Sequence, residues 1–309
     1  MTELQSSASS FFSSFSGAAA GAACDHIVDQ LIAERGHTLV RSPLWPLMRP
    51  FLYGVLHYHE ARRMADAVAE MTADETFQHI SSLLDLNVSA RGLGNIPKSG
   101  AVIVASNHPT GIADGVAMFD LLSAHRPDMV FFANRDAVRV NTRLAQRIIP
   151  VEWRASEKSH AKSRETLVRT NRAFADGNAV VMFPSGRIAF WHEGRLTERP
   201  WQASAVQLAR RYNAPIVPMH MSARNSGLFY FLSRRNPELR DMTVFHELLN
   251  KKRKPFDITV GKIIAPEQLD GDPMAVTEKL QFHCEHRLAG DAQALFDAAV
   301  SVEKVKEAA

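Results

Sequence analysis

Apolar residues along this chain follow two different spacings, which divide it into a helical first part and an alternating second part. From residue 17 to residue 85, apolar positions recur three and four residues apart, as along one face of an α-helix. From residue 86 onward, short apolar runs alternate with longer amphipathic segments. We expect strands at 101–106, 129–134, 147–153, 179–184, 215–221 and 257–264, and helices at 113–125, 159–175 and 202–212.

This alternation predicts an α/β fold, with a largely parallel sheet flanked by helices and an N-terminal helical region in front of it. In sheets of this kind, ligands bind beyond the carboxyl ends of the strands. The expected organisation is a disordered tail at 1–16, the helical and possibly membrane-interfacial region at 17–85, an α/β domain at 86–290, and a C-terminal helix and tail at 291–309.

The most apolar stretch of the helical region, residues 43–58, is too short for a spanning helix, which needs roughly 20 apolar residues. It also contains Arg49 and two prolines, Pro46 and Pro50. We interpret it as an interfacial segment that binds the surface of a membrane, with apolar burial supported by attraction between basic residues and anionic lipid. The alternative is that its apolar face packs on the α/β domain.

Composition and charge narrow the class of protein. The 309 residues are 46% hydrophobic and 22% charged, as in an ordinary globular chain. The net charge is +3, and basic clusters such as residues 251–254 can attract anionic lipids or an acidic carrier protein, whereas no nucleic-acid-binding motif is found. Cys24 and Cys284 do not make a disulfide framework. We therefore expect a cytoplasmic protein, peripheral on the inner face of the membrane, with no nucleic-acid partner.

A histidine follows the first strand expected in the α/β part. The run AVIVAS leads into Asn107, His108 and a Pro-Thr-Gly turn, and Asp114 comes at the start of the next helix. In one continuous helix, six residues at about 100° each would separate the two side chains, but the proline and glycine favour a turn that folds Asp114 back towards the ring. A carboxylate at one ring nitrogen fixes the tautomer and leaves the other nitrogen free as a base. The alternative is a purely structural turn and helix cap.

A second strand, at 179–184, also runs into a turn. Phe183 and Pro184 are followed by Ser185, Gly186 and Arg187, where backbone amides and a guanidinium can meet an anion. Arg187 can alternatively make an ordinary surface ion pair. Further candidate substrate contacts are Asn107, which either orients a substrate or supports the turn, and two possible anion-binding residues, Arg135 and Arg154.

These blocks, in this order, resemble the PlsC-type glycerolipid acyltransferase family over roughly residues 86–265. In that family an Asn-His-(four residues)-Asp block supplies a base, a Phe-Pro-Glu-Gly-Thr-Arg block lines the acceptor site, and a Val-Pro-Val strand completes the pocket. The counterparts are Asn107-His108 with Asp114, residues 183–187, and residues 216–218. Five residues, rather than four, separate His108 from Asp114, and Ser185 replaces the glutamate. A branch with His-Pro-x-Gly-x-x-Asp-Gly and Phe-Pro-(Ala/Ser)-Gly blocks shares both departures.

The resemblance implies a membrane-lipid O-acyltransferase. His108, oriented by Asp114, takes the proton from the hydroxyl of a lysolipid, which attacks the thioester of acyl-CoA or an acyl carrier protein. Backbone amides of the 107–111 or 184–187 turn then stabilise the oxyanion. No cofactor and no metal is expected. We favour a lyso-aminolipid acceptor whose carboxylate or sulfonate meets Arg187; the alternatives are 1-acylglycerol-3-phosphate, a hydrolase that gives the acyl group to water, and a non-catalytic lipid-binding protein.

Overall fold

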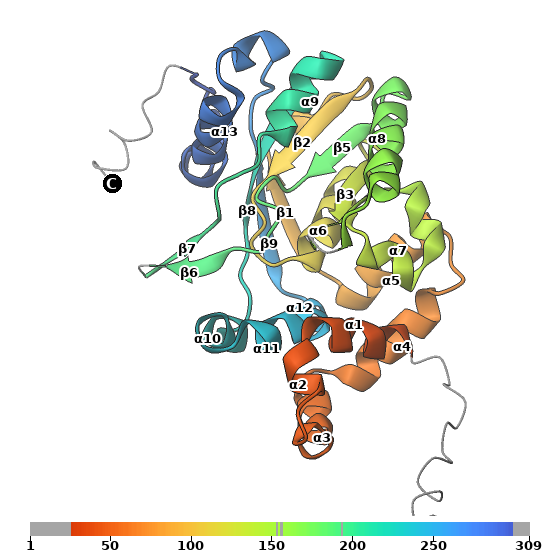
Figure 1. Cartoon of the computed structure of the whole chain (residues 1–309). Helices are drawn as coiled ribbons and strands as arrows, with labels where there is room; N and C mark the ends of the chain where they lie inside the picture. Colours follow the sequence, from red (N-terminus) through yellow and green to blue (C-terminus); the bar gives the residue numbers. More distant parts are fainter. Residues whose placement is uncertain (1–25, 153, 155–156, 193, 299–309) are drawn as a thin grey trace, which may run out of the picture.

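A mixed seven-stranded sheet forms the centre of the protein in the computed structural model, which describes residues 26–298 except 153, 155, 156 and 193 (Figure 1). The expected tail at 1–16, Cys24 and the chain beyond residue 298 lie outside these residues. The strand order is β1-β9-β8-β2-β5-β3-β4. The strands are β1 (Asn87–Arg91), β2 (Val102–Ser106), β3 (Val130–Asn134), β4 (Ile148–Val151), β5 (Ala179–Met182), β8 (Ile216–Ser222) and β9 (Pro255–Val260).

Five of these strands run parallel, which confirms the predicted largely parallel sheet. β2 is parallel to both β5 and β8, β3 is parallel to both β5 and β4, and only the pairing of β8 with β9 is antiparallel. Every residue of β2 and of β5 is buried. This complete burial explains why both strands are continuous apolar runs in the sequence, because helices cover both faces of a parallel sheet.

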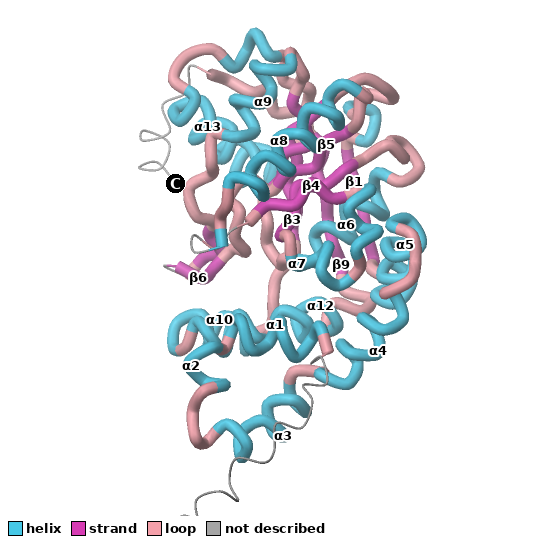
Figure 2. The backbone as a smooth tube through the Cα atoms, turned by 45° about the vertical axis from the view of Figure 1, so that its right-hand side comes forward, coloured by secondary structure: helices cyan, strands magenta, loops and turns pink. Residues whose placement is uncertain are grey.

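Helices cover the two faces of the sheet in two layers. Along β2, Val102 and Val104 face one layer, whereas Ile103 and Ala105 face the other. The first layer contains α1 (Ile27–Arg35), α4 (Tyr58–Val68), α5 (Ala73–Leu84), α6 (Ile112–Leu122), α11 (Pro237–Met242) and α12 (Val244–Leu249). The second contains α8 (His160–Ala175), α9 (Ser204–Tyr212) and α13 (Pro273–Phe282) (Figure 2).

The N-terminal helices share the core of the α/β domain. Leu31 of α1, Met64 of α4 and Leu84 of α5 belong to the same buried cluster as Val104 of the sheet. The expected boundary between residues 85 and 86 therefore separates two parts of one hydrophobic core. Further helices complete this end of the molecule: α2 (His37–Val40), α3 (Trp45–Val55), α7 (Asp136–Val140) and α10 (Gly227–Arg235).

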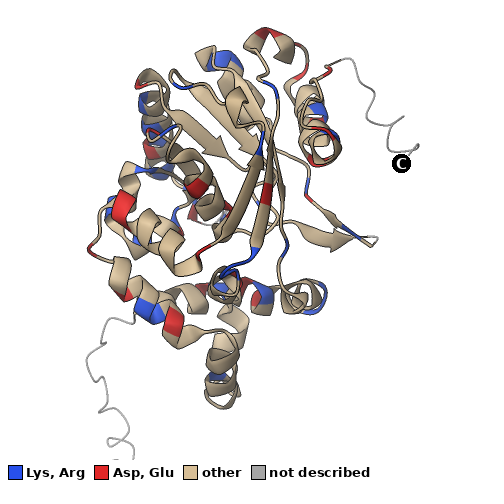
Figure 3. Ribbon diagram, turned by 180° about the vertical axis from the view of Figure 1, so that it is seen from behind, with Lys and Arg blue, Asp and Glu red and all other residues tan. Residues whose placement is uncertain are grey.

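Helix α3, like the four-residue helix α2 before it, has no buried residue. It projects away from the sheet (Figure 1), and its only charged residue is Arg49 (Figure 3). Leu44, Leu47, Phe51 and Val55, spaced along one face, are 60%, 80%, 73% and 39% exposed. Trp45 and Tyr53 pack against the core from the opposite side. In the part of the chain that the structure describes, no helix has the length and apolar character needed to cross a membrane.

Strand β1 was not among the strands expected from the sequence, and three further features differ from that pattern. Helices α10 to α12 fill the stretch between β8 and β9, and a two-stranded hairpin, β6 (Phe190–His192) with β7 (Arg195–Thr197), projects from the sheet (Figure 1). The C-terminal helix ends early: α13 continues through a π-turn (His283–Arg287) into α14 (Leu288–Gly290), and residues 291–298 form turns and coil instead of the expected helix. The carboxylate of Asp291 accepts the backbone N–H of Gln293 at 2.8 Å, a local bond that competes with helix.

Candidate active site

The two sequence blocks meet at one edge of the sheet, because β2 and β5 are parallel neighbours that end side by side. The loop after β5 packs directly on the turn after β2. The backbone N–H of Ala189 donates to the carbonyl oxygen of His108 at 2.9 Å. Gly111 has a φ of +99°, and an added Cβ would lie 2.7 Å from the Ile188 side chain. Glycine is therefore required here both by backbone conformation and by close approach.

The turn brings Asp114 back to the ring of His108, as its chemistry predicts. Nδ1 of His108 lies 2.8 Å from Oδ2 of Asp114, whose side chain is completely buried, whereas the histidine side chain is 18% exposed. The ring nitrogen is not yet aligned for a hydrogen bond. Catalytic contacts are often poorly aligned before substrate binds. The arrangement leaves the second ring nitrogen for a proton donor.

Asp114 also caps its own helix. Its Oδ2 accepts the backbone N–H of Thr110 at 2.8 Å and that of Gly111 at 3.0 Å, and its Oδ1 accepts the Thr110 hydroxyl. Backbone donors at the start of a helix stabilise a negative charge. The structural role of a cap and the orientation of the imidazole are thus combined in one carboxylate.

His108 is held from two further sides by residues that the sequence analysis did not single out for this role. The ring of Phe183 stacks on its ring, with centroids 4.3 Å apart and planes inclined by 19°. The backbone N–H of His108 donates to the carboxyl group of Glu198, which also accepts the indole N–H of Trp201 at 2.7 Å. Burial, followed by the charge of Glu285, raises the pKa of Glu198 to about 8. Nothing in the local pattern around Glu198 indicates this contact, because it depends on the return path of the hairpin.

The side chain of Asn107 is hydrogen-bonded to the neighbouring strand β8. Its Nδ2 donates to the carbonyl oxygen of Met221 at 2.8 Å, and its Oδ1 accepts the Met221 N–H at 2.7 Å. Both ends of the buried amide are therefore used to join β2 to β8. Of the two roles considered for Asn107, the geometry favours support of the turn over contact with a substrate.

The turn after β5 carries Arg187, whose guanidinium is available to bind an anion. Ser185 donates its hydroxyl to the carbonyl of Arg187 at 2.8 Å, and Gly186 adopts a left-handed φ of +62° while its N–H donates to the Phe183 carbonyl. The side chain of Arg187 is exposed, and within the described residues its guanidinium has no hydrogen bond or ion pair. This position can accept an anionic headgroup.

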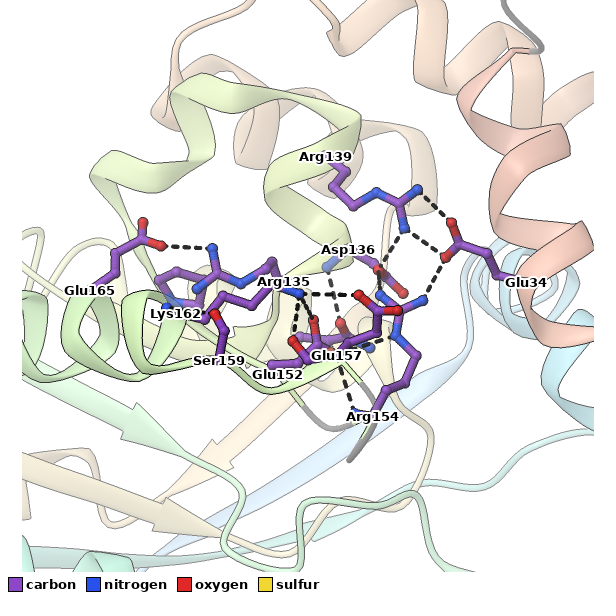
Figure 4. Close-up of polar contacts among 12 residues, drawn as sticks. Glu34, Arg135, Asp136, Arg139, Glu152, Arg154, Glu157, Ser159, Lys162 and Glu165 are labelled. Atoms are coloured by element: carbon purple, nitrogen blue, oxygen red, sulfur yellow. Dashed lines mark hydrogen bonds and ion pairs between the residues drawn. The ribbon is translucent and has the colours of Figure 1, made fainter.

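Arg135 and Arg154, the other two expected anion contacts, are already paired with internal carboxylates (Figure 4). Arg135 lies 2.7 Å from Glu165, and Arg154 lies 2.6 Å from Glu34 of α1. Arg139 pairs with the same Glu34, and these two guanidinium groups, with Arg139 dominant, lower the pKa of Glu34 to about 2. The structure therefore assigns Arg154 to an ion-pair network that joins α1 to the α/β domain. The pair of Arg154 with Glu34 could not be predicted from the sequence, because the two residues lie far apart in the chain.

Within the described residues, the two turns differ in how their backbone donors are used. In the first turn, the N–H groups of His108, Thr110 and Gly111 all have carboxylate acceptors. In the second turn, the N–H groups of Ser185 and Ile188 have no hydrogen-bond partner among the described residues. The loop after β5, rather than the turn of His108, is therefore the better source of donors for a developing oxyanion.

Among the described residues, the carboxyl end of the parallel sheet thus brings together a histidine–carboxylate pair, an unpaired guanidinium and unpaired backbone amides, which are groups that acyl transfer can use. Residues 87–222 match the family described as Acyltransferase. The part of the chain that carries both sequence blocks is therefore similar to PlsC-like acyltransferases, and acyltransferase is the enzyme class that this similarity supports.

Three individual proteins illustrate the likeness. A protein of Phocaeicola vulgatus named lyso-glycine lipid O-acyltransferase is 26% identical over 226 residues, which cover 71% of this chain and 79% of that protein. The protein of the same name from Bacteroides thetaiotaomicron is 24% identical, with 71% and 81% covered. Among solved structures, the 1-acyl-sn-glycerophosphate acyltransferase PlsC of Thermotoga maritima aligns with a TM-score of 0.45 and 14% identity, covering 84% of this chain and 96% of that one.

Proposed function

We propose that this enzyme transfers a fatty acyl group from acyl-CoA or an acyl carrier protein to the hydroxyl of a lyso-aminolipid, with His108 as the general base. The observation that carries the proposal is the 2.8 Å approach of His108 Nδ1 to the buried Asp114. A carboxylate at this distance stabilises the imidazolium that forms when the ring takes a proton, and it selects one tautomer of the imidazole once Nδ1 is aligned with it.

The reaction is a direct transfer. His108 removes the proton from the acceptor hydroxyl, and the oxygen attacks the thioester carbonyl carbon. The tetrahedral oxyanion collapses, the C–S bond breaks, and the thiolate leaves with the proton that His108 carries. A positioned base contributes roughly 10² to 10⁴ in rate, and an oxyanion donor contributes roughly 10² to 10³. We assign the donor role to the N–H groups of Ser185 and Ile188, which have no partner among the described residues.

Two observations favour an aminolipid acceptor. The relatives from Phocaeicola vulgatus and Bacteroides thetaiotaomicron both carry the name lyso-glycine lipid O-acyltransferase. In this chain Ser185 stands where glycerolipid acyltransferases have glutamate, and the guanidinium of Arg187 is exposed. A carboxylate or sulfonate on an aminolipid headgroup suits this guanidinium, because two parallel N–H···O bonds can form. The alternative acceptor, 1-acylglycerol-3-phosphate, would use Arg187 for its phosphate.

We also propose that the enzyme attaches peripherally to a membrane through helix α3. Its exposed face, formed by Leu47, Phe51 and Val55 with Leu44 just before the helix, is apolar and accompanied by Arg49. Such a helix binds an interface by burying its apolar face while basic residues meet anionic lipid. Attachment to the membrane surface through α3 suits an enzyme whose proposed acceptor is itself a membrane lipid.

Competition between the two lysolipids tests the acceptor. Purified enzyme receives one acyl donor and an equimolar mixture of lyso-glycine lipid and lysophosphatidate, and the products are separated by mass. We expect preferential acylation of the aminolipid, and Arg187→Ala should raise its KM about tenfold or more, whereas Arg172→Ala, which removes an exposed arginine of α8, should not. Preferential conversion of lysophosphatidate would reverse the acceptor assignment, and acyl release without any lysolipid would indicate a hydrolase.

A further inference from the structure

The carboxyl group of Glu198 lies between two N–H donors in the interior of the protein. The residue directly follows strand β7 and is only 7% exposed. One of its oxygens accepts the backbone N–H of His108, and the other accepts the indole N–H of Trp201 at 2.7 Å. Trp201 itself is buried, so its indole N–H cannot turn to water instead.

The bond to His108 acts on the part of the residue that determines where the ring lies. Asp114 holds the ring at Nδ1, Phe183 holds its face, and Ala189 holds the carbonyl oxygen. Glu198 is the group that holds the N–H. A buried donor that loses its acceptor retains the full penalty of desolvation, so the peptide would shift to find another partner. A shift of the peptide would carry the imidazole away from Asp114.

We propose that Glu198 is a positioning residue whose ionised carboxylate holds the main chain of His108 in register for acyl transfer, and that protonation of this carboxylate releases the contact. The inference rests on the catalytic role proposed for His108. It adds a residue from the hairpin return, outside both sequence blocks of the family, to the support of the base.

The surroundings of Glu198 raise the pKa of its carboxyl group far above the ordinary value. Burial is the largest influence, and the charges of Glu285 on the π-turn and Asp114 on α6 act in the same direction; together they raise the pKa of Glu198 to about 8. Cys284, the other titratable group that senses Glu198, is itself fully buried, with a raised pKa. The two N–H donors act in the opposite direction, because they favour the ionised form.

The sign of the pH effect follows from the donors. The carboxylate can accept at both oxygens, whereas the acid form carries a proton on one oxygen and opposes one N–H donor with an O–H donor. Protonation therefore weakens the hydrogen bond that Glu198 accepts from the N–H of His108 or the one that it accepts from Trp201. We expect kcat to rise as pH increases through about 8, in addition to any titration of the imidazole itself.

Three variants separate this role from a merely structural one. In Glu198→Gln, the side-chain NH₂ faces one of the two N–H donors, as the O–H of the acid form does. We therefore expect kcat to fall about tenfold or more at pH 9, with KM little changed. The increase of kcat through pH 8 should also be lost. Adding Trp201→Phe removes the opposed donor, so the double variant should recover much of the kcat that Glu198→Gln loses. Glu285→Gln removes a neighbouring charge but keeps the acceptor for Gln281, and should move the rise to lower pH without lowering maximal kcat.

The measurement is kcat and KM from pH 6 to pH 9.5, with thermal unfolding of each variant. An active Glu198→Gln enzyme with the wild-type pH profile would overturn the inference, and so would an unmoved profile in a folded Glu285→Gln enzyme. His108→Ala serves as the separate control. If that variant is inactive while Glu198→Gln is normal, only the positioning role fails; if His108→Ala is active, the proposed base fails first.

Discussion

The ring of Phe183 lies against the face of His108, with their centroids 4.3 Å apart. The two residues belong to different sequence blocks, so this contact links the turn after β2 to the loop after β5. An aromatic face carries partial negative charge and attracts a cation above it. The stack therefore supports the imidazolium that forms during transfer, as well as the orientation of the neutral ring.

Replacement of Phe183 by leucine tests this support. We expect kcat to fall about three- to tenfold, in line with the roughly 0.5–1.5 kcal/mol that aromatic pairs contribute, with KM nearly unchanged. Phe174, which stacks on Tyr212 in the other layer, provides the matched control: Phe174→Leu should lower the melting temperature without lowering kcat. Equal losses of kcat in the two variants would contradict a specific role for the stack.

Removal of the base and removal of its partner should have different effects on stability. His108→Ala should lower kcat by roughly 10² to 10⁴ and leave the protein folded with only a small loss of stability, because no backbone N–H loses its acceptor and the stack on Phe183 is the main contact removed. Asp114→Ala should lower kcat and also destabilise the fold by about 1 kcal/mol or more, because it leaves the N–H groups of Thr110 and Gly111 without an acceptor. Steady-state kinetics and denaturant unfolding of both variants check this. A folded His108→Ala enzyme with near-normal turnover would refute the mechanism.

Helix α3 should determine attachment to lipid. A Leu47→Glu, Phe51→Glu double variant exchanges two exposed apolar side chains for charges, so it should lose flotation with anionic vesicles while keeping kcat on a dispersed short-chain acceptor. The matched control introduces glutamates at Leu167 and Val168, which are also exposed apolar residues but lie on α8. Unchanged flotation of the α3 variant, or an equal loss in the control, would argue against α3 as the attachment site.

The ion pairs of Glu34 should make stability depend on acid pH. Arg139 and Arg154 lower its pKa to about 2 in the folded protein, below the ordinary value of 4.5. A lowered folded pKa gives stability that is present above pH 4.5 and is lost as pH falls towards 2. Glu34→Gln should therefore reduce the free energy of unfolding at pH 7 by about 1 kcal/mol or less, since the pairs are partly exposed.

Urea unfolding of wild type and Glu34→Gln at pH 7 and pH 3 checks this expectation. The difference between the two proteins should shrink at the lower pH. Glu70→Gln, at a far more exposed ion pair with Arg143, should show no comparable pH-dependent difference. A Glu34→Gln difference that stays constant over this range would mean that the pair with Arg139 is not responsible for it.

Local chemistry determined a large part of this protein. The strands at the centre of the sheet are recognisable because burial on both faces requires unbroken apolar runs, as in β2 and β5. The pairing of His108 with Asp114 was also predictable, because a Pro-Thr-Gly turn acts over a few residues and does not depend on distant parts of the chain. The resemblance to the acyltransferase family rested on these same short segments.

Tertiary structure decided the contacts between residues that are distant in sequence. The sequence predicted Arg154 to bind an anion, but in the fold α1 places Glu34 2.6 Å from it. Asn107 is hydrogen-bonded to Met221 because β8 lies beside β2. Glu198 reaches His108 because the hairpin turns the chain back over the site. A periodic pattern records which face of an element is buried, but a single polar contact between distant segments leaves no periodicity, so only the packed fold determines which polar groups are already paired and which remain for a substrate.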